Sequence, residues 1–268
     1  MRPLVLLSND DGHSSRGLRT LRDVLATWAD VVVVAPETEQ SATSHSLSLH
    51  RPLRARRVED GIFAIDGTPA DCVYIALHGE ARFLPRWPDL VVSGINRGLN
   101  LGQDAFYSGT VAAAREGALR GIPALASSAH VKVDLPRVAE LTSQLARALH
   151  EQAAPAGTTA AKKSLLHAKK TPLLNLNVPL EWTGEVRLTR LGARLYEEII
   201  DVRQDPRGRE YIWLGGPGVR HERDDGSDTD AYDDGAASIT PLLLDLTAPD
   251  DAGLASRVVD GFRANPSR

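Results

Sequence analysis

The 268-residue sequence contains one cysteine, Cys72. A single thiol cannot close an internal disulfide and cannot build a thiolate metal cage, so disulfide scaffolds and zinc-finger modules are excluded. A chain with so little cysteine is typical of a reducing compartment. Any metal site in it is therefore expected to use hard oxygen ligands.

Long apolar runs are also missing. The first run, residues 4–7, is too short for the core of a secretory signal and is followed at once by polar residues. No stretch approaches the roughly 20 consecutive apolar residues that a membrane span requires. We therefore expect a cytoplasmic protein that does not bind membranes.

Charge of one sign is not in excess, because the formal net charge is only -4. No block of Lys and Arg stands apart from acidic residues, so the electrostatic footprint of a protein that binds duplex nucleic acid is absent. Apolar residues make up 42% and charged residues 25% of the chain, which is close to the average for folded proteins. Disordered and fibrous architectures are excluded.

The apolar pattern that is present predicts alternating strands and helices. Residues 4–7 and 31–34 form continuous apolar runs typical of buried parallel strands. Between them, Leu18, Leu21 and Leu25 recur at the spacing of one helix face. Similar runs at 62–65, 90–92, 124–126 and 173–178 alternate with helices that start at Pro69, Gly109 and Leu135. We predict an α/β, Rossmann-like, doubly wound and mostly parallel sheet.

The chain is expected to divide near residue 180. Residues 1–180 are predicted to form the Rossmann-like catalytic domain that binds metal and phosphate. Residues 181–268 carry short strand patterns, including 186–188, 211–214 and 238–246, and are predicted to form a β-rich extension used for oligomerisation. Residues 151–171 lack periodicity and are expected to form a solvated linker.

Polar side chains follow several predicted strands where those strands end. Asp10 and Asp11 follow the first strand, a loop that starts at Ser41 follows the second, and Asn96 lies in the loop that follows residues 90–92. Adjacent carboxylates repel each other unless a cation or proton compensates them, so a divalent metal such as Mg²⁺ or Mn²⁺ is indicated. The alternative is that the Asp-Asp-Gly sequence is only a turn.

Ser108, Gly109 and Thr110 precede an alanine-rich helix, whose free N–H groups and dipole favour a bound phosphate. Simple N-capping by Ser108 is the alternative. His45 is a candidate proton donor to a leaving oxygen. The acidic residues 224–230 lack the Gly and Glu positions of a calcium loop and are expected to form a solvated turn.

An acidic pair after the first strand also occurs in phospho-accepting receiver domains, and Asp66 ends a later strand. A receiver needs a Lys after its last core strand, where this sequence has residues 126–128 (Ala-Ser-Ser). A non-catalytic nucleotide-binding module is not supported, since no Gly-x-Gly-x-x-Gly opens the first helix.

Taken together, the motifs resemble the SurE family of survival-protein nucleotidases. The resemblance is carried, in the family's order, by residues 6–12, 67–73, 92–96, 107–114, 205–208 and 238–242. One departure is Arg16-Gly17, where the family usually has Pro-Gly. The stretch 151–171 also looks longer than the family's usual connection.

The resemblance implies one divalent metal per subunit, Mn²⁺ or Mg²⁺, held by Asp10, Asp11, Ser41 and Asn96. It implies hydrolysis of nucleoside 5'- and 3'-monophosphates, and of short polyphosphate in some members. Asp10 and Asp11 are the expected catalytic residues, and the expected phosphate-binding residues are Asn96, Ser108, Gly109 and Thr110. A homodimer or homotetramer is implied as well, with the C-terminal part exchanged between subunits.

Overall fold

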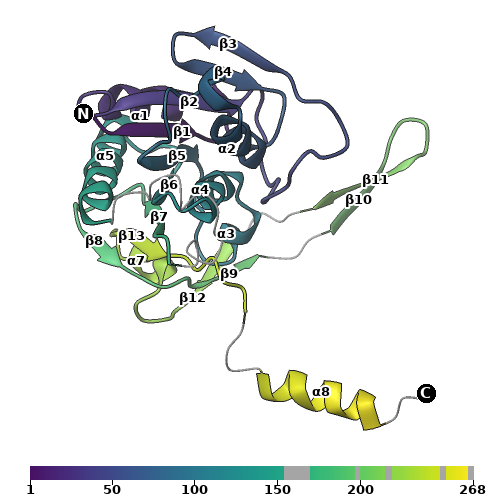
Figure 1. The fold of residues 1–268 in the computed structure, drawn as a ribbon. Coiled ribbons are helices and arrows are strands. Elements are labelled where there is room, and N and C mark those ends of the chain that lie inside the picture. The colour runs from purple at the N-terminus through teal and green to yellow at the C-terminus, as the bar shows by residue number, and fades with distance from the viewer. Residues whose placement is uncertain (154–169, 197–199, 215–218, 248–251, 265–268) are drawn as a thin grey trace.

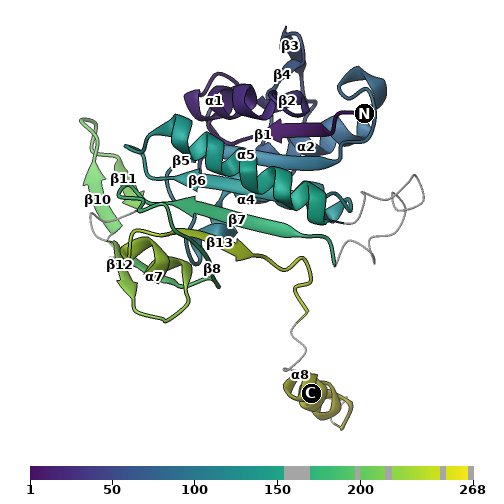
Figure 2. The same ribbon diagram turned by 90° about the vertical axis from the view of Figure 1, so that its left-hand side faces the viewer.

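The computed structural model describes residues 1–153, 170–196, 200–214, 219–247 and 252–264. A nine-stranded sheet forms its centre, with the strand order β3-β4-β2-β1-β5-β6-β7-β13-β8. Helices cover both faces of this sheet (Figures 1 and 2). Most of the linker predicted at 151–171 lies outside the described residues.

The middle of the sheet is parallel, as predicted. It consists of β1 (Leu4–Ser8), β2 (Asp30–Pro36), β4 (Ile62–Ile65), β5 (Leu90–Arg97), β6 (Ala124–Ala129) and β7 (Leu173–Val178). At one edge β3 (Ala55–Glu59) pairs antiparallel with β4. At the other, β13 (Ala237–Pro241) pairs antiparallel with β7, and β8 (Val186–Leu188) lies parallel to β13. The doubly wound, mostly parallel fold is confirmed.

Two apolar cores separate the sheet from its helix layers. Val5 and Leu7 of β1 belong to the core under α1 (Arg16–Leu25) and α5 (Leu135–Gln152). Leu4 and Leu6 belong to the core under α2 (Pro69–His78) and α4 (Gly109–Leu119). Successive side chains of a strand point to opposite faces, so a strand covered on both faces must be apolar throughout. This requirement explains the continuous apolar run at residues 4–7.

The helix start predicted at Pro69 is confirmed, and a capping box fixes it. Thr68 Oγ1 accepts a hydrogen bond from the Asp71 N–H at 3.1 Å, and the Asp71 carboxylate accepts one from the Thr68 N–H at 2.9 Å. Pro69 occupies the first turn, where no amide donor is needed. Ser15 and Ser108 cap α1 and α4 through the N–H groups of Leu18 and Val111.

The C-terminal region contributes to the central sheet and also forms smaller elements. Strands β8 and β13 extend the sheet across the domain boundary expected at residue 180. Two antiparallel pairs lie apart from it: β9 (Ala193–Tyr196) with β12 (Val219–Glu222), and β10 (Ile200–Gln204) with β11 (Glu210–Leu214). The strand predicted at 238–246 stops at Pro241. Its antiparallel partner β7 begins at Leu173, so no pairing residue remains beyond that point.

Several helices have no counterpart in the sequence prediction: α3 (Asp104–Tyr107), η1 (Glu80–Arg82), α7 (Asp228–Asp233) and α8 (Ala252–Ala264). The prediction of a solvated turn at 224–230 was wrong for the second half of this stretch, where Ser227 and Asp228 are fully buried. The Asp228 carboxylate accepts hydrogen bonds from the Gly102 and Gly192 N–H groups, at 3.0 and 2.7 Å. These distant partners offset part of the cost of burying its charge, and burial still raises the pKa of Asp228.

Among the described residues, no helix combines the length and the apolar character needed to cross a membrane.

Candidate active site

The candidate site lies where the order of the strands reverses. β1 has β2 on one side and β5 on the other, and both neighbours are parallel to it. The carboxyl ends of β1 and β5 therefore lie side by side at a topological switch point, where open α/β sheets bind their ligands. A pocket of about 900 Å³ opens at this position. We call it the catalytic pocket.

Five residues singled out by the sequence line the catalytic pocket together: Asp10, Asp11, Ser41, Asn96 and Ser108. The two aspartates follow the end of β1 after one intervening residue, and Asn96 is the penultimate residue of β5. Ser41 comes from the loop after β2, and Ser108 directly precedes α4. Side chains separated by almost 100 residues thus reach one pocket because parallel strands end at one edge.

Asp10 is deeply enclosed, with 6% of its surface exposed. The Thr110 hydroxyl donates a hydrogen bond to Asp10 Oδ1. Burial raises the pKa of Asp10 to about 6; the neighbouring charge of Asp11 also raises it, and the hydrogen bonds from Thr110 oppose the rise. Near neutral pH, keeping this buried carboxylate ionised costs free energy. A cation bound beside it would lower that cost.

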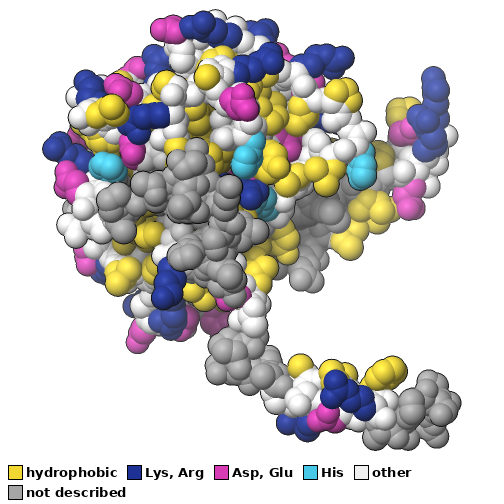
Figure 3. Space-filling view, viewed as in Figure 1, with side chains coloured by type: hydrophobic (Ala, Val, Ile, Leu, Met, Phe, Trp, Pro, Cys, Tyr) yellow, Lys and Arg dark blue, Asp and Glu magenta, His cyan; other side chains and the backbone are white. Residues whose placement is uncertain are grey.

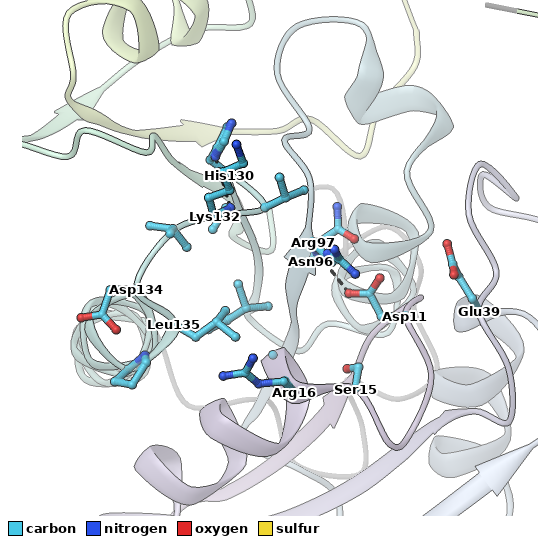
Figure 4. A pocket seen from close by; sticks show the side chains of 16 residues that line it. Asp11, Ser15, Arg16, Glu39, Asn96, Arg97, His130, Lys132, Asp134 and Leu135 are labelled. Carbon is cyan, nitrogen blue, oxygen red and sulfur yellow. Dashed lines mark hydrogen bonds between the residues drawn. The ribbon is translucent and has the colours of Figure 1, made fainter.

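Asp11 is less buried and faces the opening of the site. Its Oδ2 accepts a hydrogen bond from the Arg97 backbone N–H at 3.1 Å, drawn in Figure 4. Burial raises the pKa of Asp11 as well, whereas the Arg97 N–H and guanidinium lower it. The two neighbouring carboxylates therefore share one environment but differ in exposure.

Ser41 and Asn96 add neutral oxygens to this acidic pair. Ser41 Oγ donates to Glu39 Oε1 at 2.7 Å, and Asn96 Nδ2 donates to the Gly98 carbonyl at 3.0 Å. Since the Asn96 nitrogen is already engaged, its amide oxygen is the ligand atom it offers to the pocket. Two carboxylates, a hydroxyl and an amide oxygen are a donor set that fits a hard divalent cation. Within the described ranges, no three His, Cys, Asp or Glu side chains cluster as a metal cage.

The residues at the start of α4 have two different positions relative to the catalytic pocket. Ser108 lines the pocket, and its hydroxyl oxygen accepts from the Val111 N–H at 3.1 Å, so its own hydrogen remains available to a ligand. Gly109 and Thr110 lie behind Asp10 instead of lining the pocket. A Cβ on Gly109 would come within 2.9 Å of Asp10 Cβ, which means that only glycine lets the helix start approach so closely.

His45 does not line the catalytic pocket. Its Nε2 lies 2.9 Å from Glu116 Oε2, and Glu116 is almost fully buried and also pairs with Arg120. The structure therefore does not support His45 as the group that protonates a leaving oxygen.

A second pocket, of about 610 Å³, shares one wall with the first (Figure 4). The lining shared by both pockets consists of Asp11, Glu39, Asn96, Arg97 and Val131. The other lining residues of the second pocket come from the start of α1, from β5 and the end of β6, from the loop between β6 and α5, and from the start of α5. We call this second space the annex pocket.

A family model described as Survival protein SurE matches residues 5–198. The chain belongs to the SurE family. A protein named 5'-nucleotidase SurE from Sorangium cellulosum (strain So ce56) is 60% identical over 266 residues, which cover 99% of each chain. Another of the same name, from Syntrophotalea carbinolica (strain DSM 2380 / NBRC 103641 / GraBd1), is 44% identical over 91% of this chain and 92% of the relative. The solved structure of the SurE protein from Aquifex aeolicus superposes with a TM-score of 0.78 at 33% identity, over 96% of this chain and all of that one.

The SurE-family site also contains residues that the sequence did not single out. Glu39, Asn100, Asp104, Tyr107 and Tyr196 line the catalytic pocket. Asn100 lies three residues beyond the end of β5, so the polar residues that follow this strand were a usable signal. No sequence signal pointed to Tyr196, because it comes from β9. Its hydroxyl reaches the site by donating a hydrogen bond to Asp104 Oδ2 at 2.5 Å.

Proposed function

We propose that this SurE-family protein is a divalent-metal-dependent phosphatase that hydrolyses nucleoside monophosphates to nucleoside and phosphate. It is a phosphoric monoester hydrolase of the 5'-nucleotidase type, the activity stated in the names of its relatives. The observation that carries the proposal is the convergence of Asp10, Asp11, Ser41, Asn96 and Ser108 on one pocket. Hydrolysis of 3'-monophosphates and of short polyphosphate belongs to the proposal as well.

Asp10, Asp11, Ser41 and Asn96 would hold one metal ion per subunit, Mn²⁺ or Mg²⁺, because all four offer oxygen ligands. When bound, a divalent cation neutralises charge on phosphoryl oxygens and makes a water molecule more acidic. The raised pKa of Asp10, about 6, results mainly from burial and partly from the adjacent charge. A divalent cation held by these residues would offset the cost of keeping Asp10 ionised.

The protein's own groups position the phosphate and move the proton. Ser108 would donate its hydroxyl hydrogen to a bound phosphoryl group, and the positive end of the α4 dipole favours an anion at that position. The second Nδ2 hydrogen of Asn96 would give the phosphate a further polar contact. Asp10 or Asp11 accepts a proton from the attacking water, which reacts in line with the leaving alkoxide.

The receiver-domain alternative gains no support from the fold. β6 ends in Ser127, Ser128 and Ala129, all of them buried, so no Lys stands at the strand end where a receiver needs one. The family match and the relatives both favour the hydrolase.

We also propose that the protein acts as a homodimer or homotetramer in the cytoplasm, with residues 181–268 mediating association. Exposed apolar side chains on α8 and on the β10–β11 hairpin support association. They include Leu254, Val258, Phe262, Ile212 and Trp213.

Phosphate release from a panel of 5'- and 3'-nucleoside monophosphates, with Mn²⁺, Mg²⁺ or chelator, tests the enzymatic proposal. We expect release with metal and none with chelator. Asp10→Ala and Asp11→Ala are each expected to lower kcat/KM by at least about 100-fold, as for loss of groups that act on the reacting atoms. Ser41→Ala and Asn96→Ala should mainly raise the metal concentration needed for half-maximal activity.

Asp23→Ala serves as the matched control, because Asp23 is an exposed carboxylate of α1 that pairs with the neighbouring Arg22. Absence of phosphate release under every metal condition would reject the phosphatase. Full metal-dependent activity in both Asp10→Ala and Asp11→Ala would reject the site assignment.

A further inference from the structure

The annex pocket is continuous with the proposed site yet is not used by the hydrolysis described above. Asp11, Asn96 and Arg97 separate its space of about 610 Å³ from the catalytic pocket. A substrate whose phosphate lies next to Ser108 therefore has room to extend past Asp11 into a second chamber.

The annex pocket contains cations from three separate elements. Arg16 is the first residue of α1, Arg97 ends β5, and Lys132 lies in the loop between β6 and α5. Figure 4 shows Arg16 and Lys132 on different walls of the pocket, with Asp11 and Asn96 on a third.

Arg16 and Lys132 differ from most basic residues of the described chain, because neither side chain forms a hydrogen bond or ion pair with another described residue. By contrast, Arg19 and Arg22, on the same helix as Arg16, both reach Glu59. Two unpaired cations around one pocket indicate that their charge is available to a ligand.

Two helix N-termini add to this positive field. α1 begins at Arg16 and has no acidic residue in its first turn. α5 begins at Leu135, and both Leu135 and Pro136 line the annex pocket. Because N–H groups at a helix start lack intrahelical partners, both starts favour an anion over a neutral group.

Carboxylates also line the annex pocket, and they limit the charge it presents when no metal is bound. Asp11, Glu39 and Asp134 formally balance Arg16, Arg97 and Lys132. In Figure 4 the Asp134 carboxylate points away from Arg16, and Glu39 accepts from the Ser41 hydroxyl. With a divalent cation at Asp11, the chamber becomes net positive.

We propose that the annex pocket binds a second phosphoryl group of the substrate, so that nucleoside 3',5'-bisphosphates are preferred to nucleoside monophosphates. This inference rests on the proposed phosphatase activity. One phosphoryl group occupies the catalytic pocket and is hydrolysed, while the other stays intact between Arg16 and Lys132. The leaving nucleoside then keeps one phosphate.

Arg16→Pro is a specific test because the backbone accepts it. Arg16 occupies the first helical position, where the fixed φ of proline suits a helix start and no intrahelical N–H bond is lost. Ser15 before it has φ -62° and ψ 145°, an extended conformation that tolerates a following proline. The substitution removes the cation and leaves the capping by Ser15 in place.

The experiment compares kcat/KM for adenosine 3',5'-bisphosphate, AMP and inorganic tripolyphosphate in the parent, Arg16→Pro and Lys132→Ala. Arg19→Ala is the matched control, because Arg19 lies one turn further along α1 and lines neither pocket. Bisphosphate binding is measured separately by calorimetry in an Asp10→Asn background, so that affinity does not depend on turnover.

We expect the parent to prefer the bisphosphate to AMP, with a preference that falls as salt increases. Arg16→Pro and Lys132→Ala should each lower kcat/KM and affinity for the bisphosphate about five- to tenfold, as for loss of one exposed charge-assisted hydrogen bond. AMP hydrolysis should stay within about twofold.

Equal kcat/KM for bisphosphate and AMP in the parent, or an unchanged ratio in both variants, would overturn the proposal while leaving the phosphatase intact. A loss confined to tripolyphosphate would reassign the annex pocket to linear polyphosphate and would also overturn it. Failure of the parent to hydrolyse AMP would instead reject the phosphatase proposal.

Discussion

The position of Asp10 depends on how closely the start of α4 approaches it. Thr110 donates to its carboxylate, and Gly109 leaves no space between helix and aspartate. A Cβ at Gly109 would lie 2.9 Å from Asp10 Cβ, 3.1 Å from Asp10 Oδ2 and 3.0 Å from Pro69 Cγ. The carboxylate geometry is thus set by a residue that has no side chain.

Gly109→Ala is therefore expected to displace Asp10. Because a shift of about 1 Å at a catalytic group costs roughly 100-fold in rate, we expect kcat/KM to fall by about that factor. Unfolding free energy should fall by about 1–3 kcal/mol from overpacking. Phosphate-release kinetics and thermal unfolding measure the two effects.

Gly117→Ala in the same helix is the control. Its added Cβ would lie 2.5 Å from Val91 Cγ2 and far from the catalytic pocket. We expect a similar loss of stability with nearly full activity. Equal activity losses in the two variants would show that Gly109 acts only through folding.

The buried charge of Asp10 makes the metal-free protein pH-sensitive. Its pKa is raised from 3.8 to about 6, so the folded state binds this proton more tightly than the unfolded state. The resulting destabilisation is fully present above about pH 6 and is lost as the pH falls from there toward 3.8.

In chelator, Asp10→Asn should consequently be more stable than the parent by about 3 kcal/mol at pH 7.5 and by about 1 kcal/mol at pH 4.5. Chemical unfolding at the two pH values measures this difference. A difference that does not change with pH would show that the Asp10 carboxylate has an ordinary pKa in the folded protein.

At the scale of elements, α7 connects the C-terminal region to the loops around the site. Asp228 accepts from Gly102, which follows β5, and from Gly192, which precedes β9. The carboxylate is fully buried. β9 in turn brings Tyr196 to the catalytic pocket, so this single carboxylate supports one of its walls.

Asp228→Ala should lower the unfolding free energy by roughly 3 kcal/mol or more, because two buried N–H groups lose their acceptor. Asp225→Ala, an exposed residue of the same acidic stretch, should change it by less than about 0.5 kcal/mol. Urea unfolding compares them, and equal effects would contradict the role assigned to Asp228.

At the scale of the whole molecule, α8 lies clear of the central sheet in both ribbon views (Figures 1 and 2). Its apolar side chains are exposed, and Figure 3 shows them along one side of the helix. Leu254, Val258 and Phe262 recur at intervals of four, which places them on one face. Such a face is stabilised when it packs against another surface.

We expect the double variant Leu254→Ser, Phe262→Ser to shift the protein toward the monomer. Size-exclusion chromatography with light scattering measures the mass at micromolar concentration. Arg263→Ser, on the same helix, should leave the mass unchanged, since Arg263 is an exposed cation that pairs with Asp260 of its own helix. A parent protein that is already monomeric would contradict the predicted oligomer.

Much of the fold could be predicted because it depends on short-range patterns. The apolar run at residues 4–7 and the helix start at Pro69 are local signals, and both elements formed as predicted. α7 and the environment of Asp228 were not predictable, because their stability depends on N–H groups from distant loops. The strand at Ser238 was predicted too long, since its end is set by its partner β7.

The sequence by itself determined the alternation of strands and helices, the polar residues at the strand ends and the SurE resemblance, because each depends on residue type and spacing along the chain. The tertiary structure alone decided which side chains meet. Parallel strands bring Asp10, Asp11, Ser41 and Asn96 to one edge and place Ser108 against them, while His45 is held by Glu116 outside the pocket. The annex pocket also belongs to this second group, since its cations come from three elements that become neighbours only when the sheet and its helices pack.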